Sequence, residues 1–186
     1  MDKHRIRTAT TAVLISLRAA KVTLYAAAVS LALLALLHVL SPEYAPSWRM
    51  VSEYANGNFG WVLTLTFMAM AVSCVALYFT LTSQIETKWG KIGLKLLLVV
   101  AGALVIASLF PIDPITAKQG ELTIQGNIHG LASIVGVPGF SIAAMLIAYS
   151  LVQNPAWAPS RRILLIAANS TWISLVLLLL VIGIML

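Results

Sequence analysis

Two side chains suited to proton chemistry stand on either side of one polar stretch in the second half of the sequence. Asp113 follows a long apolar run, in SLFPIDP, and His129 opens the next apolar run, in GNIHG. A histidine can serve as a general base, and a nearby carboxylate can orient it. Ser52, in an earlier polar stretch, would complete a Ser/His/Asp set, although no nucleophile elbow surrounds it. We therefore predict Asp113, His129 and Ser52 as catalytic candidates, with a His/Asp pair that activates water as an equal alternative.

The polar stretch around Ser52 predicts a binding surface as well. It reads SEYANGN and combines carboxylate, phenol and amide groups, which together donate and accept hydrogen bonds. His38 ends an earlier apolar run, at a depth that should match the depth of His129. The predicted ligand-binding residues are Glu53, Tyr54, Asn56, Gly57 and His38.

The two histidines, His38 and His129, also raise the question of a metal or a haem. Catalytic zinc normally has three protein ligands, so Asp113 would have to supply the third. A bis-histidine haem requires both rings to face one cavity. Because residue types alone do not set these geometries, we assign no metal ligand and leave the cofactor unknown. The structural alternative is that each histidine bonds to a loop carbonyl and that Asp113 starts a turn before Pro114.

The residues at the expected helix ends carry further predictions. Asn58 and Asn127 accompany the starts of two apolar runs, and asparagine is a typical N-cap residue. We expect them to cap these helices; the alternative is that the free N–H groups there hold an anionic headgroup. Asp113 follows a helix C-terminus, where the dipole disfavours a carboxylate. It is therefore expected to have a hydrogen-bond donor as a partner, or a chemical task.

Five long apolar runs must position these residues. They cover residues 22–40, 60–82, 92–110, 128–152 and 163–186. Each holds roughly the 20 residues that a helix needs to cross a bilayer, where a span must satisfy its own backbone hydrogen bonds. The sequence therefore predicts an all-α, polytopic helical bundle, with one transmembrane domain (22–186) after a basic segment (1–21). With 60% hydrophobic and 10% charged residues, against about 25% charged in globular domains, the composition excludes a soluble domain.

The net charge of +6 indicates topology rather than nucleic-acid binding. Ten of the twelve Lys and Arg residues fall on one side of the runs: Lys3, Arg5, Arg7, Arg18, Lys21, Lys88, Lys91, Lys95, Arg161 and Arg162. The positive-inside rule places that side, and the N-terminus, in the cytoplasm. We predict a cell-membrane location with loops 41–59 and 111–127 outside the cytoplasm. The predicted partner is membrane lipid, with a membrane-protein partner or a homo-oligomer left open.

Three stretches together resemble a known family: SPEYAPSWRMVSEYANGNFGW, then FPIDP, then GNIHG. They resemble the bacterial and archaeal membrane proteins grouped as family 998 of the domains of unknown function. The resemblance covers residues 25–186 and picks out Ser52, Tyr54, Asn56, Gly57, Asp113 and His129. It implies several spans, commonly six, so a sixth span beyond Leu186 is an expectation. It implies no established activity.

Four function hypotheses follow, and the sequence leaves open whether the protein is an enzyme. The leading hypothesis is a membrane protein whose outward-facing polar pocket binds a lipid or a small amphiphile. Asp113, His129, Tyr54 and Asn56 would line this pocket, with Ser52 and Glu53 at its rim. The second is a hydrolase of lipid-like substrates in the same pocket, with His129 as base and Asp113 as its orienter or a metal ligand. The third is a haem-carrying subunit that uses His38 and His129. The fourth is an accessory subunit of a membrane complex, in which the polar residues are purely structural.

The predicted topology is testable with reporter fusions. Alkaline phosphatase, which is active only outside the cytoplasm, is expected to be active when fused after Gly120 and inactive when fused after Glu86, because the basic flanks hold the latter loop inside. Enzyme activity per amount of fusion protein is the measurement. An inactive fusion after Gly120 together with an active one after Glu86 would overturn the orientation.

Overall fold

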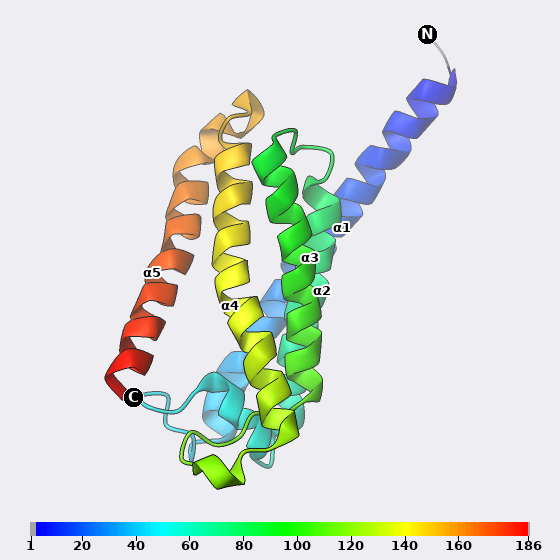
Figure 1. The fold of residues 1–186 in the computed structure, drawn as a ribbon. Helices are drawn as coiled ribbons and strands as arrows, with labels where there is room; N and C mark the ends of the chain where they lie inside the picture. Colours follow the sequence, from blue (N-terminus) through cyan, green and yellow to red (C-terminus); the bar gives the residue numbers. More distant parts are fainter. Residues whose placement is uncertain (1–2, 186) are drawn as a thin grey trace.

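The computed structural model describes the backbone of residues 3–185 and the side chains of residues 16–118 and 120–181. The described backbone contains helices and loops but no strand (Figure 1). The long helices are α1 (Lys3–Leu40), α2 (Gly60–Leu81), α3 (Lys88–Leu109), α4 (Ile124–Leu151) and α5 (Arg161–Met185). Three short 3-10 helices lie in the connecting loops: η1 (Val51–Asn56), η2 (Gln119–Glu121) and η3 (Pro155–Ser160).

Each long helix supplies a segment that is long and apolar enough to cross a membrane. These segments are Ser16–Leu40, Gly60–Leu81, Lys88–Leu109, Ile124–Leu151 and Pro155–Val181, with a mean hydropathy between 2.1 and 2.5. The prediction of an all-α, five-span polytopic bundle is therefore confirmed. Helices α3, α4 and α5 begin before the predicted apolar runs, because polar residues such as Lys88 belong to their first turns.

The helices pack chiefly against their neighbours in sequence: α1 on α2, α2 on α3, α3 on α4 and α4 on α5. In Figure 1, α5 lies beside α4 at one edge of the bundle, and the first half of α1 extends away from the other helices at the top of the view. About a third or more of each span of α2, α3 and α4 is buried, but only 11% of the spans of α1 and α5. The middle three helices therefore form the core, and the two flanking helices expose most of their apolar surface.

Small residues allow α3 and α4 to approach each other closely. A Cβ atom added to Gly93 would lie 2.9 Å from the Cβ of Leu146, and one added to Gly139 would lie 3.2 Å from Cγ2 of Val100. Close backbone approach of this kind drives helix association in lipid, where apolar burial gives little advantage. Glycines thus let α3 and α4 approach closely, and large side chains such as Leu97 and Ile147 pack in the core beside them.

The two ends of the bundle are closed by different loops. One end carries the short loops 82–87 and 152–160, and we call it the basic end because Lys88, Lys91, Arg161 and Arg162 lie beside these loops. There, Trp157 Nε1 donates to Gln84 Oε1 over 3.1 Å, so the two loops contact each other directly. The other end carries the longer loops 41–59 and 110–123, and we call it the capped end.

The role of Gly93 predicts a selective loss of stability. Gly93→Leu is expected to destabilise the protein by about 1–3 kcal/mol, because the added side chain must push α4 away. Gly102→Leu, in the same helix, is the matched control, since nothing lies within 4 Å of a Cβ added there. Thermal unfolding in detergent measures both, and equal melting temperatures for the two variants would contradict the close-approach argument.

Candidate functional site

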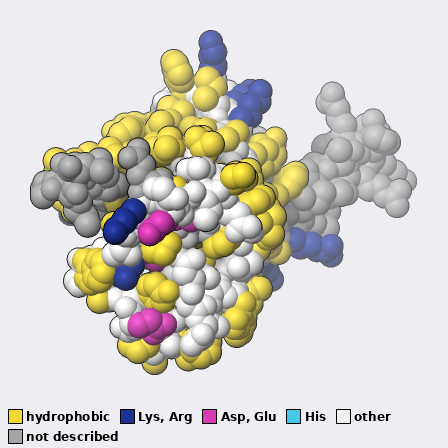
Figure 2. Space-filling model, turned by 60° about the horizontal axis from the view of Figure 1, so that its bottom comes forward, with side chains coloured by type: hydrophobic (Ala, Val, Ile, Leu, Met, Phe, Trp, Pro, Cys, Tyr) yellow, Lys and Arg dark blue, Asp and Glu magenta, His cyan; other side chains and the backbone are white. Residues whose placement is uncertain are grey.

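The capped end brings the two loops with the predicted site residues together. In Figure 1 these loops lie side by side across the same end of the bundle. Figure 2 shows that this end exposes a few acidic and basic side chains among uncharged atoms, with hydrophobic side chains around its rim. A polar surface ringed by apolar side chains is typical of a membrane protein's end, where the chain meets the lipid headgroups.

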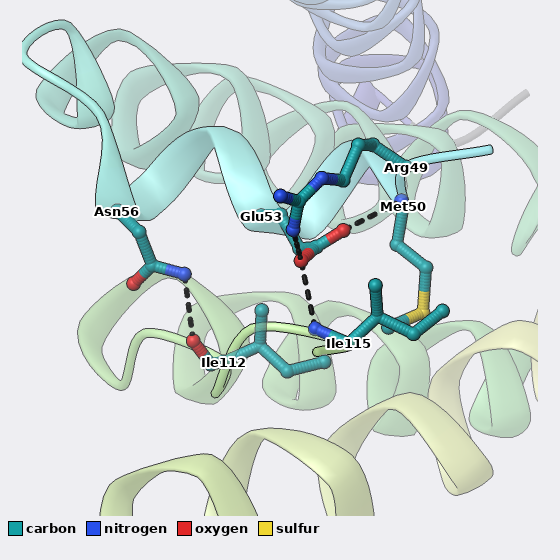
Figure 3. A network of polar contacts seen from close by, with 6 residues as sticks. All are labelled: Arg49, Met50, Glu53, Asn56, Ile112 and Ile115. Atoms are coloured by element: carbon teal, nitrogen blue, oxygen red, sulfur yellow. Dashed lines mark hydrogen bonds and ion pairs between the residues drawn. The ribbon is translucent and has the colours of Figure 1, made fainter. Parts of the chain in front are cut away.

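Glu53 is the centre of the contacts between the loops. Its side chain is fully buried in η1, and its Oε1 accepts hydrogen bonds from Arg49 Nη1 at 2.7 Å and from the N–H of Ile115 at 2.8 Å. Its Oε2 accepts from the N–H of Met50 at 3.1 Å (Figure 3). A buried carboxylate is tolerated when it is paired and hydrogen-bonded, and Glu53 meets both conditions.

Asn56 adds a second hydrogen bond between the same loops. Its Nδ2 donates to the carbonyl of Ile112 at 2.9 Å, three residues before the Glu53 contact at Ile115 (Figure 3). These two hydrogen bonds lie on either side of Asp113 and Pro114. Loop 41–59 therefore fixes the backbone both before and after Asp113.

Asp113 has the donor partner that its position predicted. Its Oδ2 accepts from the N–H of Thr123 and its Oδ1 from the hydroxyl of Thr123, both at 2.8 Å. A Cβ added to Gly126 would collide with this carboxylate. Asp113 therefore packs against the first turn of α4, whose positive dipole end favours a carboxylate, although it follows α3 in sequence.

The residues that start the helices differ from our prediction. The N-cap of α4 is Thr123, whose hydroxyl accepts from the N–H of Gly126 at 2.9 Å, while Asn127 is already inside the helix. The N-cap of α2 is Phe59, which makes no side-chain capping bond, so Asn58 does not cap α2. The prediction of two asparagine caps was wrong because the helices begin where tertiary contacts, such as the bond from Thr123 to Asp113, fix the backbone.

His129 is buried in the second turn of α4 and bonds to the end of α3. Its ring is 1% exposed, and its Nδ1 lies 2.7 Å from the carbonyl oxygen of Phe110 and 3.1 Å from that of Ala107. Carbonyls only accept hydrogen bonds, so Nδ1 of His129 carries a proton and is the donor. The last carbonyls of a helix lack partners within it, and His129 supplies one, as the structural alternative expected.

The predicted catalytic residues lie at the same end but are not joined by hydrogen bonds among the described residues. The Asp113 carboxylate bonds to Thr123, and the Nδ1 of His129 bonds to backbone carbonyls. Ser52 is half-buried in η1, and its hydroxyl has no hydrogen bond within the described part of the chain. Over the described residues, no three His, Cys, Asp or Glu side chains form a group that could hold a metal ion.

A second group of polar side chains surrounds Tyr54 where α1 ends. Tyr54 is nearly buried, its hydroxyl donates to the carbonyl of Tyr44 at 3.0 Å, and its ring centroid is 5.4 Å from that of His38. His38 is exposed, and its Nδ1 donates to the carbonyl of Leu34 at 2.8 Å, which leaves Nε2 without a hydrogen bond among the described residues. Burial and the nearby Glu43 carboxylate raise the pKa of Tyr54, so its hydroxyl stays protonated and remains a donor.

Gly57 is also placed by this group. A Cβ added to Gly57 would lie 2.9 Å from Cε2 of Tyr44 and 3.3 Å from Oε1 of Glu43. Glycine therefore lets the first loop pass close to the Tyr44 ring.

Ser41 and Arg49 are two candidate functional residues that were not predicted from the sequence. Ser41 has a fully buried side chain, and its hydroxyl has no partner among the described residues. The Arg49 guanidinium stacks over the Trp48 ring, 4.2 Å from its centroid, while it pairs with Glu53. The i, i+4 spacing of Arg49 and Glu53 was a usable signal for the pair, but no sequence pattern indicated that Ser41 is buried.

Together, the five spans and the polar capped end define a multi-pass integral membrane protein. The chain belongs to the family described as Protein of unknown function (DUF998), which matches residues 24–185. The predicted resemblance is thereby confirmed. Searches of curated proteins and of solved structures gave no match.

The buried position of Glu53 predicts that its charge is needed for folding. Glu53→Gln is expected to lower stability by about 1–3 kcal/mol, because Arg49 loses its partner in a mostly buried site. Glu121→Gln is the matched control: this exposed carboxylate also accepts from a backbone N–H three residues earlier, that of Lys118 at 3.0 Å. Thermal unfolding in detergent should separate the two variants, and a Glu53→Gln protein as stable as wild type would refute the role of the pair.

Proposed function

We propose that this membrane protein binds a lipid or a small amphiphile at the capped end, and that this end faces the outside of the cell membrane. The observation that carries the proposal is the His38–Tyr54 pair. An exposed imidazole, whose Nε2 has no hydrogen bond among the described residues, lies against a phenol whose position is fixed by its own hydrogen bond. The buried Tyr54 ring holds the His38 ring in place, and the exposed imidazole offers a polar headgroup a hydrogen bond at the edge of an apolar helix surface.

The surroundings of the pair suit an amphiphile in particular. On α1, the neighbouring Val39 and Leu36 are exposed, so an acyl chain would lie along apolar side chains while the headgroup contacts His38. The hydroxyl of Ser41, one turn further on, is buried without a partner among the described residues. An orphaned buried hydroxyl calls for a water or a ligand atom as its partner, and it lies in the same region.

The hydrogen bonds of the other candidates favour binding over hydrolysis. In the hydrolase alternative, His129 needs Asp113 or a metal to orient it, yet its Nδ1 bonds to carbonyls of α3 and Asp113 bonds to Thr123. The haem alternative requires His38 and His129 to face one cavity, whereas one ring is exposed and the other is 1% exposed against Phe67. We therefore place the binding site at His38 and Tyr54.

The proposal is tested by native mass spectrometry of the full chain, gently extracted from its own membrane. Wild type is expected to retain a lipid or amphiphile of defined mass, and His38→Leu and Ser41→Ala are expected to lose most of it. Gln153→Leu is the matched control, since Gln153 is also exposed near a helix end and bonds to the carbonyl four residues earlier, at 3.1 Å. Equal retention by His38→Leu and Gln153→Leu would overturn the site, as would a wild-type protein that carries no small molecule.

A further inference from the structure

A second candidate site lies between the helices rather than at the capped end, and it is independent of the proposed function. An apolar groove of about 500 Å³ runs between α1, α2 and α3. This volume falls within the roughly 300–1,000 Å³ that is typical of small-molecule sites. Its lining includes Val22, Val72, Phe79, Leu98, Gly102 and Val105.

The groove opens sideways, toward the membrane. Phe79 is 54% exposed and Val72 is 51% exposed, although both line it. Gly102 contributes no side chain, and nothing lies within 4 Å of the place where its Cβ would be. The first half of α1 leaves the bundle near this region (Figure 1). An elongated apolar molecule can therefore enter from the bilayer without any movement of the helices.

Basic side chains mark one end of the groove. On α3, Lys91 and Lys95 precede the lining residues Leu98, Gly102 and Val105 at successive spacings of four, three, four and three residues. This spacing puts all five on one face of the helix. Both lysines are exposed and lie in the first two turns of α3, so the apolar face that lines the groove continues into two positive charges.

A third basic side chain comes from the opposite wall. Arg18 of α1 is exposed and lies one turn before the lining residue Val22, on the side of the basic end. The hydroxyl of Ser16 donates to the carbonyl of Thr80 at 3.1 Å, which places this part of α1 beside the last turn of α2. Among the described residues, none of Arg18, Lys91 and Lys95 is in an ion pair.

We propose that this groove holds an anionic phospholipid from the leaflet at the basic end. One acyl chain lies along Val72, Phe79 and Leu98, and the phosphate is bound by Lys91, Lys95 and Arg18. Clusters of Lys and Arg at the membrane surface attract anionic lipids electrostatically. The combination of an apolar groove with cations at one end matches the chemistry of a phospholipid along its whole length.

The test measures lipid binding to the full chain in detergent by native mass spectrometry. The probes are dioleoyl phosphatidylglycerol and dioleoyl phosphatidylcholine, which share their acyl chains and differ in charge. Wild type is expected to prefer the anionic lipid. The Lys91→Gln/Lys95→Gln variant is expected to bind that lipid about five- to thirty-fold more weakly, at roughly five-fold per lysine, with the affinity for phosphatidylcholine unchanged.

Two further variants separate the lipid from other occupants. Arg161→Gln/Arg162→Gln removes the same charge from the same end, on exposed residues of α5, and should leave the preference intact. Gly102→Phe fills the groove and should weaken binding of both lipids. Equal effects of the two double variants would overturn the proposal. A Gly102→Phe protein that binds both lipids as tightly as wild type would also overturn it. So would a Gly102→Phe protein that binds lipid normally but loses an oligomer seen for wild type, because a second copy of the chain would then be the occupant of the groove.

Discussion

Burial of the Glu53 carboxylate is the interaction on which the capped end depends. A charged group this far from water is stable only when its oxygens have partners. The partners of Glu53 come from two separate loops: Arg49 and Met50 from loop 41–59, and Ile115 from loop 110–123. The same carboxylate thus sets the shape of η1 and the path of the chain after α3. Tyr54, the next residue after Glu53, is positioned as a consequence, and with it the ring against which His38 packs.

The residues that looked most reactive turn out to satisfy backbone groups at helix ends. Asp113 accepts from the residue that caps α4, and His129 donates to carbonyls in the last turn of α3. The first N–H groups and the last carbonyls of a helix have no partner within it, so a side chain that supplies a partner stabilises the helix end. Histidine and aspartate suit this task for the same reason that they suit catalysis: each places a hydrogen-bonding atom at a fixed distance from its own backbone.

The sequence predicted the number of spans, the all-α fold and the meeting of the two long loops at one end. It did so because apolar runs of membrane length and their alternating order require no tertiary information. It also indicated that Asp113 needs a donor. It failed on the helix caps, where Thr123 rather than Asn127 begins α4, and on the burial of Ser41 and Glu53. Those features depend on partners that are distant in the sequence, such as Glu53 and Ile115, which are 62 positions apart. The periodicity of apolar residues does not indicate such pairs.

The long separation between Glu53 and Ile115 has a consequence for how the chain is assembled. When the first loop leaves the ribosome, Arg49 is already present, but Ile115 has not yet been made. Glu53 must therefore remain in contact with water until α2 and α3 have entered the membrane and the third loop has followed. Closure of the capped end is thus a late event in biosynthesis, and the contact between His38 and Tyr54 reaches its final form only after α3 is in place.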